Sequence, residues 1–215
     1  MCILSIVRKK NQFILTHNRD EDVARTTSRT LITENKFDVR ATFPMDEMSG
    51  GTWVLTSKLW STAILNGALE NHKRNPPYRH SRGIFPFMLL EFDNIENYVQ
   101  SLDLSGIEPF TQVIFNHDSE DLYVLYWDEK EINLVHTEED CLVLSSAPLY
   151  SQKEKEYHKK AIANLKNPTA DELALLHKEL AWEYNKDIPM LKTTSQVQIV
   201  ANLTNKYMKF NKFSK

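Results

Sequence analysis

The residues best suited to chemistry gather near the start of the chain. Cys2 follows the initiator methionine, and residues 17–22 read His-Asn-Arg-Asp-Glu-Asp directly after a short β-branched run. A guanidinium next to a thiol stabilises the thiolate, and a neighbouring carboxylate can orient an ammonium group. Cys2, Arg19 and Asp20 therefore form a coherent candidate site, although such a polar run is equally typical of a solvated turn at a strand end.

Two short strands should position these residues. The runs 3–7 and 13–16 are rich in β-branched and apolar residues, and a polar turn at 8–11 separates them, which is a hairpin pattern. In a hairpin the end of the second strand lies beside the start of the first. The sequence therefore predicts that the polar run lies near Cys2.

The rest of the chain alternates blocks of strands with pairs of helices, without an internal repeat or a linker. We expect strands at 52–56, 60–65, 111–115, 122–127, 132–135, 141–144, 195–201 and 207–210, and helices at 81–92, 95–102, 151–165 and 171–184, with a polar loop at 70–82. This order predicts a layered α+β fold that occupies residues 1–215 as a single domain.

The composition excludes several classes of protein. The 215 residues include 26 basic and 29 acidic side chains, and 41% are hydrophobic. This balance argues against gross disorder and against a general nucleic-acid binder. No apolar run approaches the roughly 18 residues of a membrane-spanning helix, so we expect no stable membrane insertion.

The cysteines and histidines indicate the cellular compartment and whether a metal site is expected. Cys2 and Cys141 are too few for a disulfide scaffold and suit a reducing compartment, which predicts a cytoplasmic protein. The apolar start precedes its positive charges, the reverse of a secretory signal. The seven histidines show no close metal-ligand spacing, so we expect no metal site.

Seven short motifs occur in order along the chain. They are Met1-Cys2, Asn18-Arg19-Asp20-Glu21, Gly50-Gly51-Thr52-Trp53, Asn66-Gly67, Ser81-Arg82-Gly83, Ser145-Ser146-Ala147 and Thr194-Ser195-Gln196-Val197. With these motifs the sequence resembles, at nearly full length, the TANGO2-like (transport and Golgi organisation 2) family, which is named after its Asn-Arg-Asp-Glu motif.

The family is similar to N-terminal nucleophile (Ntn) hydrolases, so the resemblance implies a four-layer αββα sandwich. In the cysteine enzymes of that class, removal of the initiator methionine frees an amine that acts as the base for the cysteine's own thiol. Carried over, Cys2 would be nucleophile and base, Arg19 the partner of the thiolate, and Asp20 the anchor of the amine. Asn66, at a strand end, would be a candidate oxyanion donor.

One position departs from the family pattern. Many members carry asparagine where this chain has Ser146, and in related acylases that asparagine amide completes the oxyanion hole. A serine hydroxyl is shorter, so Ser146 is a weaker candidate for the second donor. We assign Asn18, Trp53 and Arg82 to substrate binding, although a buried tryptophan more often belongs to a core.

The basic loop from His72 to Arg82 has two interpretations. Its cations could receive a carboxylate or phosphate at the start of the following helix, with Gly83 allowing close backbone approach. The alternative is a solvated loop that balances a mildly acidic protein, and we favour it for all but Arg82 and Gly83.

These observations lead to a hypothesis and two alternatives. The hypothesis is a cysteine Ntn-type amidohydrolase that cleaves a non-peptide amide of a small molecule without a cofactor. The first alternative is a non-catalytic protein that binds or transports haem or an acyl-CoA-like lipid metabolite. The second is an interaction protein in which residues 18–21 are only a structural turn. Substrate and oligomeric state stay open.

Overall fold

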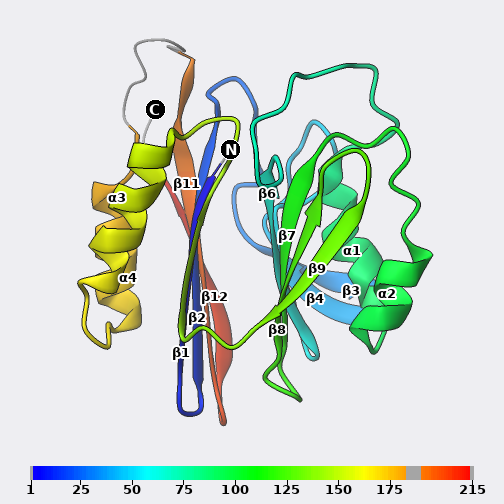
Figure 1. Ribbon diagram of the computed structural model, residues 1–215. Helices are drawn as coiled ribbons and strands as arrows, with labels where there is room; N and C mark the ends of the chain where they lie inside the picture. The colour runs from blue at the N-terminus through cyan, green and yellow to red at the C-terminus, as the bar shows by residue number, and fades with distance from the viewer. Residues whose placement is uncertain (1, 183–189, 214–215) are drawn as a thin grey trace. The chain divides into compact units, whose positions relative to one another are not determined.

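The computed structural model describes residues 2–182 and 190–213, and within these ranges it contains two antiparallel sheets and four α-helices (Figure 1). The elements form two compact units, Met1–Arg25 with Glu139–Lys215 and Thr26–Glu138. We call them unit 1 and unit 2 and describe each by itself. No helix in the described ranges is long and apolar enough to cross a membrane.

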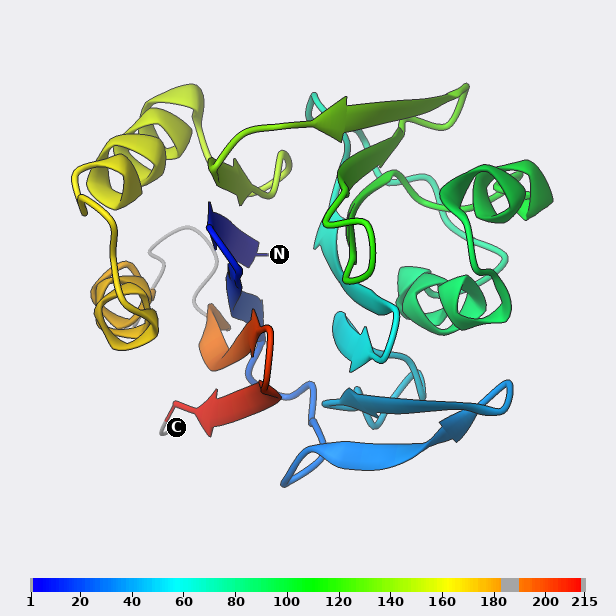
Figure 2. The ribbon, with the colours of Figure 1, turned by 90° about the horizontal axis from the view of Figure 1, so that it is seen from below.

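Unit 1 is built on a five-stranded sheet with the order β10-β1-β2-β11-β12. The strands are β1 (Cys2–Lys9), β2 (Gln12–Asp22), β10 (Cys141–Ser145), β11 (Leu191–Asn202) and β12 (Lys206–Lys212). Two helices, α3 (Gln152–Ala163) and α4 (Ala170–Glu179), lie over one face of this sheet (Figure 2). Ile3, Ile14 and Val200 on the strands pack there against Ile162 and Leu173 on the helices.

Both helices of unit 1 begin at a capping box. Ser151 caps α3 with Glu154 as its reciprocal partner, and Thr169 caps α4 with Glu172. Each box satisfies backbone N–H groups that a helix start leaves without partners, which fixes where the helix begins. The helices therefore start at defined points over the sheet.

Side-chain amides of the sheet dock α4. Gln198 donates to the carbonyl of Ala170, Gln196 to that of Ala174, and Asn18 to that of His177, at 2.7, 2.9 and 2.6 Å. The three carbonyls recur at helical spacing along one side of α4. Polar residues of β2 and β11 thus hold the helix in register with the sheet.

Unit 2 is a seven-stranded antiparallel sheet whose strands follow one another in sequence order. The strands are β3 (Ile32–Lys36), β4 (Val39–Phe43), β5 (Val54–Ser57), β6 (Trp60–Asn66), β7 (Phe110–Asn116), β8 (Leu122–Trp127) and β9 (Ile132–Thr137). The helices α1 (Phe85–Met88) and α2 (Ile95–Ser101) lie between β6 and β7 in the chain. Trp60, Tyr98 and Phe110 lie at the centre of the core.

Two glycines of the family motifs serve close packing in unit 2. A Cβ atom on Gly51 would lie 2.9 Å from the backbone of Gly83, and one on Gly83 would lie 3.1 Å from the nitrogen of Thr52. The backbones are joined by a hydrogen bond from Thr52 N to Gly83 O of 2.9 Å. The close backbone approach expected at Gly83 is thus made to another segment of the chain.

Most predicted strands are confirmed, and the differences have physical causes. The strand predicted at 13–16 continues to Asp22, and residues 17–20 are buried in it, so the solvated-turn interpretation of this run is wrong. The pair β3 and β4 was not predicted, because β3 is polar after Ile32 and the apolar face of β4 has only the three residues Val39, Ala41 and Phe43. The helix predicted at 81–92 divides into α1 and two 3₁₀ turns, Arg82–Ile84 and Leu89–Glu91, around Pro86.

The remaining helices are confirmed with shorter bounds. The helix α2 ends at Ser101, α3 ends at Ala163, and α4 ends at Glu179. The final residues of the helix predicted at 171–184 lie outside the described residues.

Candidate functional site

Cys2 and Arg19 lie directly opposite each other in unit 1. Cys2 opens β1, and the antiparallel register of β1 with β2 pairs it with Arg19. Side chains of directly opposed residues point to the same face of a sheet. The prediction that a hairpin brings the polar run beside Cys2 is confirmed.

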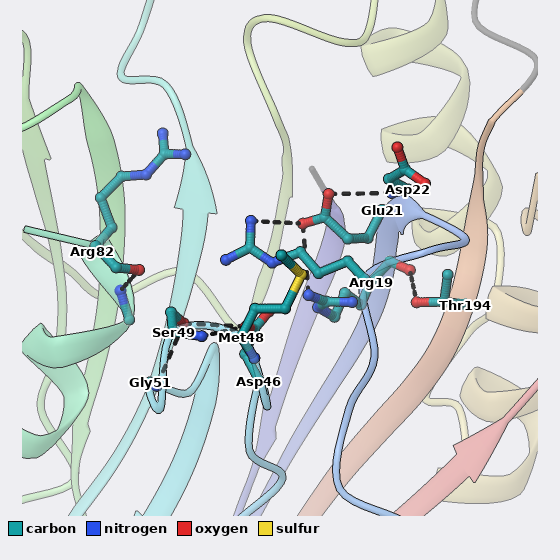
Figure 3. A network of polar contacts seen from close by, with 12 residues as sticks. Arg19, Glu21, Asp22, Asp46, Met48, Ser49, Gly51, Arg82 and Thr194 are labelled. Atoms are coloured by element: carbon teal, nitrogen blue, oxygen red, sulfur yellow. Dashed lines mark hydrogen bonds and ion pairs between the residues drawn. The ribbon is translucent and has the colours of Figure 1, made fainter. Parts of the chain in front are cut away.

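The motif Asn18-Arg19-Asp20-Glu21 is divided between the two faces of the sheet, because successive side chains of a strand alternate. Asn18 and Asp20 point to the face that α3 and α4 cover, where Asn18 donates to a carbonyl of α4. Arg19 and Glu21 point to the opposite face (Figure 3), and this is also the face of Cys2 because Cys2 pairs with Arg19. The thiol and the Asp20 carboxylate therefore lie on different faces of the sheet, and the role of Asp20 as the anchor of the amine stays a prediction.

Arg19 is held by contacts on its own face and at its backbone. Its guanidinium lies 3.5 Å from the carboxylate of Glu21, which also pairs with Arg25 at 3.8 Å (Figure 3). The hydroxyl of Thr194 donates to the Arg19 carbonyl at 3.1 Å. The positive charge next to Cys2 is thus shared with an acid that sequence reasoning did not select.

The carboxylate of Asp20 is fully buried and receives two hydrogen bonds from hydroxyl groups. Tyr150 donates to Oδ2 and Thr193 donates to Oδ1, each at 2.5 Å. Burial raises the pKa of Asp20 to about 6, and the two hydrogen bonds act against this rise because they favour the ionised form. Asp20 therefore titrates close to neutral pH.

Tyr150 is itself built into the helix layer. Its ring packs against the rings of His158 and Trp182, with centroid distances of 4.8 and 4.9 Å. Burial, followed by the nearby charge of Asp20, strongly raises the pKa of the Tyr150 hydroxyl. The phenol therefore stays protonated and remains a donor to Asp20.

Ser146 lies at the backbone nitrogen of Cys2. The Cys2 nitrogen donates to Ser146 Oγ at 2.8 Å, and the Ser146 nitrogen donates to the Cys2 carbonyl at 2.9 Å. The hydroxyl acts here as an acceptor toward the nitrogen that would become the α-amine. This geometry differs from the expected role of Ser146 as a donor to an oxyanion.

Cys2 is buried, with 4% of the residue exposed. Burial raises the pKa of the Cys2 thiol above its ordinary value, the positive charges of the N-terminus and of Arg19 lower it, and the charge of Asp20 raises it. The guanidinium therefore acts in the expected direction, but desolvation outweighs it. In this form of the chain the thiol is protonated at neutral pH.

Three predicted site residues belong to unit 2. Asn66 ends β6 and pairs with Phe110 across the sheet, Trp53 is buried, and Arg82 lies in the 3₁₀ turn before α1. Their proximity to Cys2 stays a prediction.

The basic loop of unit 2 binds an internal acid. The carboxylate of Glu108 is nearly buried and lies 3.1 Å from Arg82, 2.9 Å from Arg74 and 3.5 Å from His72. Arg82 also donates to the carbonyl of Pro109 at 3.0 Å. These contacts give the loop cations a structural partner within the unit, and the sequence held no signal that Glu108 would be that partner.

The family model of Transport and Golgi organisation 2 matches residues 1–211. The chain belongs to this TANGO2 family. No curated protein matches it. The resemblance inferred from the ordered motifs is therefore confirmed over nearly the whole chain.

In this TANGO2 family member, sequence reasoning missed three residues that contact Arg19 or Asp20. They are Glu21, Tyr150 and Thr193. Glu21 belongs to a motif that signalled the family, whereas Tyr150 and Thr193 carried no pattern that would connect them to Asp20. No group of three or more potential metal ligands occurs within residues 2–182 and 190–213.

Proposed function

We propose that this TANGO2 family protein is a cytoplasmic cysteine amidohydrolase of the Ntn type, with residues 1–215 forming one four-layer domain. Its substrate would be a non-peptide amide of a small molecule, cleaved without a cofactor. The observation that carries the proposal is the surroundings of Cys2. Arg19 lies opposite its side chain, and Ser146 Oγ accepts a hydrogen bond from its nitrogen.

In the proposed reaction, removal of Met1 converts the Cys2 amide nitrogen into an α-amine. An α-amine with a pKa near 7.7–8.0 can take the proton of a neighbouring thiol. The thiolate attacks the amide carbonyl, and the ammonium returns its proton to the leaving nitrogen. Water then hydrolyses the thioester and restores the thiol.

The residues around the amine support this chemistry. Ser146 Oγ already accepts from the nitrogen at 2.8 Å, so it would also accept from the ammonium. Asp20 supplies a negative charge from the other face of the sheet, close enough to influence the thiol. The Ser146 hydroxyl would therefore stabilise the protonated amine, whereas the charge of Asp20 would favour the ammonium but raises the pKa of the thiol. Asn66 is proposed as the oxyanion donor, and Trp53 and Arg82 are proposed to bind the substrate. The Asn18 amide is engaged with the His177 carbonyl on the helix face, so the assignment of Asn18 to substrate binding is not kept.

The first experiment is the intact mass of the purified protein. We expect a chain that begins at Cys2, whereas full retention of Met1 would eliminate the amine as base. A variant that inserts alanine between Met1 and Cys2 serves as the matched control, because it keeps the thiol but moves the amine by one residue.

The second experiment screens small amides for turnover. Cys2→Ala should abolish hydrolysis and Cys2→Ser should leave a small residual rate, while Cys141→Ser should leave the rate unchanged because Cys141 is exposed at the far end of its pairing with β1. Full turnover by Cys2→Ala would disprove the proposal.

A second function is favoured by a different observation. A groove of about 730 Å³ is lined by residues of α4, β11 and β12 and by Trp182 and Phe213. Its lining also includes Lys178 of α4, and none of the lining residues that the structure describes is acidic. Aromatic walls with a cation suit an amphipathic anion, which supports binding of haem or an acyl-CoA-like metabolite without catalysis.

Calorimetric titration with haem and with a series of acyl-CoA esters tests this second function. We expect saturable binding that weakens at least threefold in Lys178→Gln. Lys130→Gln, which removes a lysine from a separate pocket of unit 2, is the control. Absence of saturable binding by the unaltered protein would rule the second function out.

A further inference from the structure

The sheet of unit 1 carries a buried hydroxyl that has no hydrogen-bond partner. Ser195 on β11 is 1% exposed, and its Oγ contacts neither donor nor acceptor within the part of the chain that the structure describes. Buried polar groups are nearly always paired, and an unpaired one requires an explanation such as a bound water or ligand. Ser195 also belongs to a family motif to which the proposed mechanism gives no role.

A β-bulge decides where this hydroxyl points. Thr193 pairs with Asp20 and Ser195 pairs with Arg19, so Thr194 is an extra residue on β11. Without the bulge, Thr193 and Ser195 would share a face, because side chains two residues apart do so. With it, Thr193 points to Asp20 on the helix side, and Ser195 points to the face of Arg19 and Cys2.

Ser195 therefore continues a row of side chains that crosses the sheet on the face of Cys2. Cys2 pairs with Arg19, Arg19 pairs with Ser195, and Ser195 pairs with Lys212 on β12. Neighbouring strands are separated by about 4.8 Å, so Ser195 lies roughly 10 Å and Lys212 roughly 14 Å from Cys2 along the row. The row presents a nucleophile, a guanidinium, a hydroxyl donor and an ammonium group in that order.

We propose that Ser195 is a substrate-binding residue and that this row selects amides with a carboxylate about 10 Å from the scissile carbonyl. A carboxylate accepts hydrogen bonds and carries the charge that guanidinium and ammonium groups favour. It would satisfy the Ser195 hydroxyl and lie within reach of Lys212. The proposal rests on the proposed function for the role of Cys2 as nucleophile, but recognition of the carboxylate does not require hydrolysis.

Alkylation of Cys2 by two matched reagents tests this selectivity. The reagents are 6-(iodoacetamido)hexanoate and its uncharged counterpart N-hexyl iodoacetamide, and peptide mass spectrometry measures the rate at each cysteine. We expect the charged reagent to be favoured about tenfold at Cys2 relative to Cys141, which is exposed and serves as the internal reference. Ser195→Ala and Lys212→Met should each reduce this preference at least threefold.

The matched control is Lys209→Met. Lys209 lies on the same strand as Lys212 but points to the helix face, where it pairs with Asp171 at 3.2 Å. We expect this variant to keep the full preference. Equal rates for the two reagents at Cys2, or an unchanged preference in Ser195→Ala, would overturn the proposal.

A binding measurement covers the case in which neither reagent reaches the buried thiol. Calorimetry would compare N-acetyl-6-aminohexanoate with N-hexylacetamide, and we expect only the carboxylate to bind, at least threefold more weakly in Ser195→Ala. Absence of binding, or equal binding of both compounds, would overturn the proposal. Binding of the carboxylate without turnover of any amide would support carboxylate recognition by the row of Cys2, Arg19, Ser195 and Lys212, and it would disprove the proposed hydrolase activity.

Discussion

Asp20 shows how two hydroxyl groups can keep a buried carboxylate near the point of ionisation. Burial disfavours its charge, while Tyr150 and Thr193 stabilise that charge through short hydrogen bonds. The result is a pKa raised from 3.8 to about 6. A carboxylate in this range can change its charge near neutral pH, and with it the field at Cys2.

The raised pKa of Asp20 predicts a pH-dependent effect of Asp20→Asn on stability. A raised carboxyl pKa means that the folded protein binds the proton more tightly, so this stabilisation is present below pH 3.8 and is lost as the pH rises through 6. Asp20→Asn has no carboxyl group to ionise at this position, so its free energy of unfolding does not fall in this way. Relative to the unaltered protein, the variant should gain roughly 2.5 kcal/mol in free energy of unfolding between pH 4 and pH 7.

Urea unfolding at a series of pH values measures this difference. Asp22→Asn is the control, because Asp22 is exposed at the end of the same strand. An effect of Asp20→Asn that does not change with pH would show that the carboxyl has no raised pKa.

Two buried serines of unit 1 should respond oppositely to replacement by alanine. Ser5 Oγ lies 2.7 Å from His177 Nε2, whereas Ser195 Oγ has no partner among the described residues. Ser5→Ala should cost about 1–3 kcal/mol, because it leaves a buried imidazole nitrogen unpaired. Ser195→Ala should leave the free energy of unfolding unchanged or raise it by up to about 1 kcal/mol.

Chemical denaturation of both variants without added ligand checks this contrast. A loss of more than about 1 kcal/mol in Ser195→Ala would indicate that the hydroxyl has a structural partner after all. If Ser195→Ala keeps its stability but binds the carboxylate more weakly, the result would instead support the proposed role of Ser195 in substrate binding.

At the scale of elements, α4 is attached to its sheet by polar as well as apolar contacts. Beside the three amide-to-carbonyl hydrogen bonds, His177 is fully buried between α4 and the sheet and contacts Ser5. Burial lowers the pKa of His177 to about 3. The helix therefore packs on the sheet around an imidazole that is neutral at physiological pH.

The neutral imidazole predicts that acid weakens the protein. Because the pKa of His177 is lowered, the unfolded chain binds more protons below pH 6.5, and this contribution to stability is lost as the pH falls from 6.5 toward 3. The loss should be roughly 4–5 kcal/mol for a complete titration. His177→Gln keeps a hydrogen-bonding side chain without the titration, so its stability should fall less steeply.

Unfolding free energies of the protein and of His177→Gln at pH 7, 5.5 and 4.5 test this. His136→Gln is the control, because His136 is about half exposed and lies in unit 2. Parallel pH profiles for the protein and His177→Gln would contradict the expected role of the imidazole.

The sequence predicted the helices and strands better than it predicted the face of the sheet to which each side chain points. The hairpin of β1 and β2 follows from apolar runs around a polar turn, and it sufficed to place Arg19 beside Cys2. The sequence did not reveal that residues 17–22 continue the strand, because a buried polar run resembles a turn when its partners are unknown. Tyr150 and Thr193 are more than 100 residues from Asp20 in the sequence, so no local sequence pattern could predict their hydrogen bonds to it.

The bulge at Thr194 illustrates the same limit. Alternation along β11 would place Thr193 and Ser195 on one face, and only the register with β2 shows that they serve opposite faces. The strands β3 and β4 were missed for a related reason, since β3 is polar after Ile32 and the apolar face of β4 has only the three residues Val39, Ala41 and Phe43. Fold class and family could be predicted, whereas the direction of individual side chains could not.

At the scale of the whole molecule, each unit has its own apolar core. The cluster around Ile3, Ile14 and Leu173 belongs entirely to unit 1, and the cluster around Trp60 and Tyr98 belongs entirely to unit 2. Unit 2 is one continuous segment, but unit 1 combines two segments that are distant in the sequence.

This division predicts how fragments behave. Residues 26–138 expressed alone should unfold cooperatively on heating, because their seven strands and core are complete. Residues 139–215 alone should not, because β1 and β2 form the centre of their sheet. A peptide of residues 1–25 added to the second fragment should restore cooperative unfolding, as followed by circular dichroism. Cooperative unfolding of residues 139–215 without the peptide would contradict this prediction.

The strand order β10-β1-β2-β11-β12 also has a consequence for synthesis on the ribosome. The hairpin that carries Cys2 and Arg19 emerges first, but both of its flanking strands are translated only after residue 140. The hydroxyl groups that bind Asp20, from Tyr150 and Thr193, arrive later still. A nascent chain that stops before Thr193 therefore holds the nucleophile without its complete surroundings, so the proposed chemistry can begin only when translation is nearly finished.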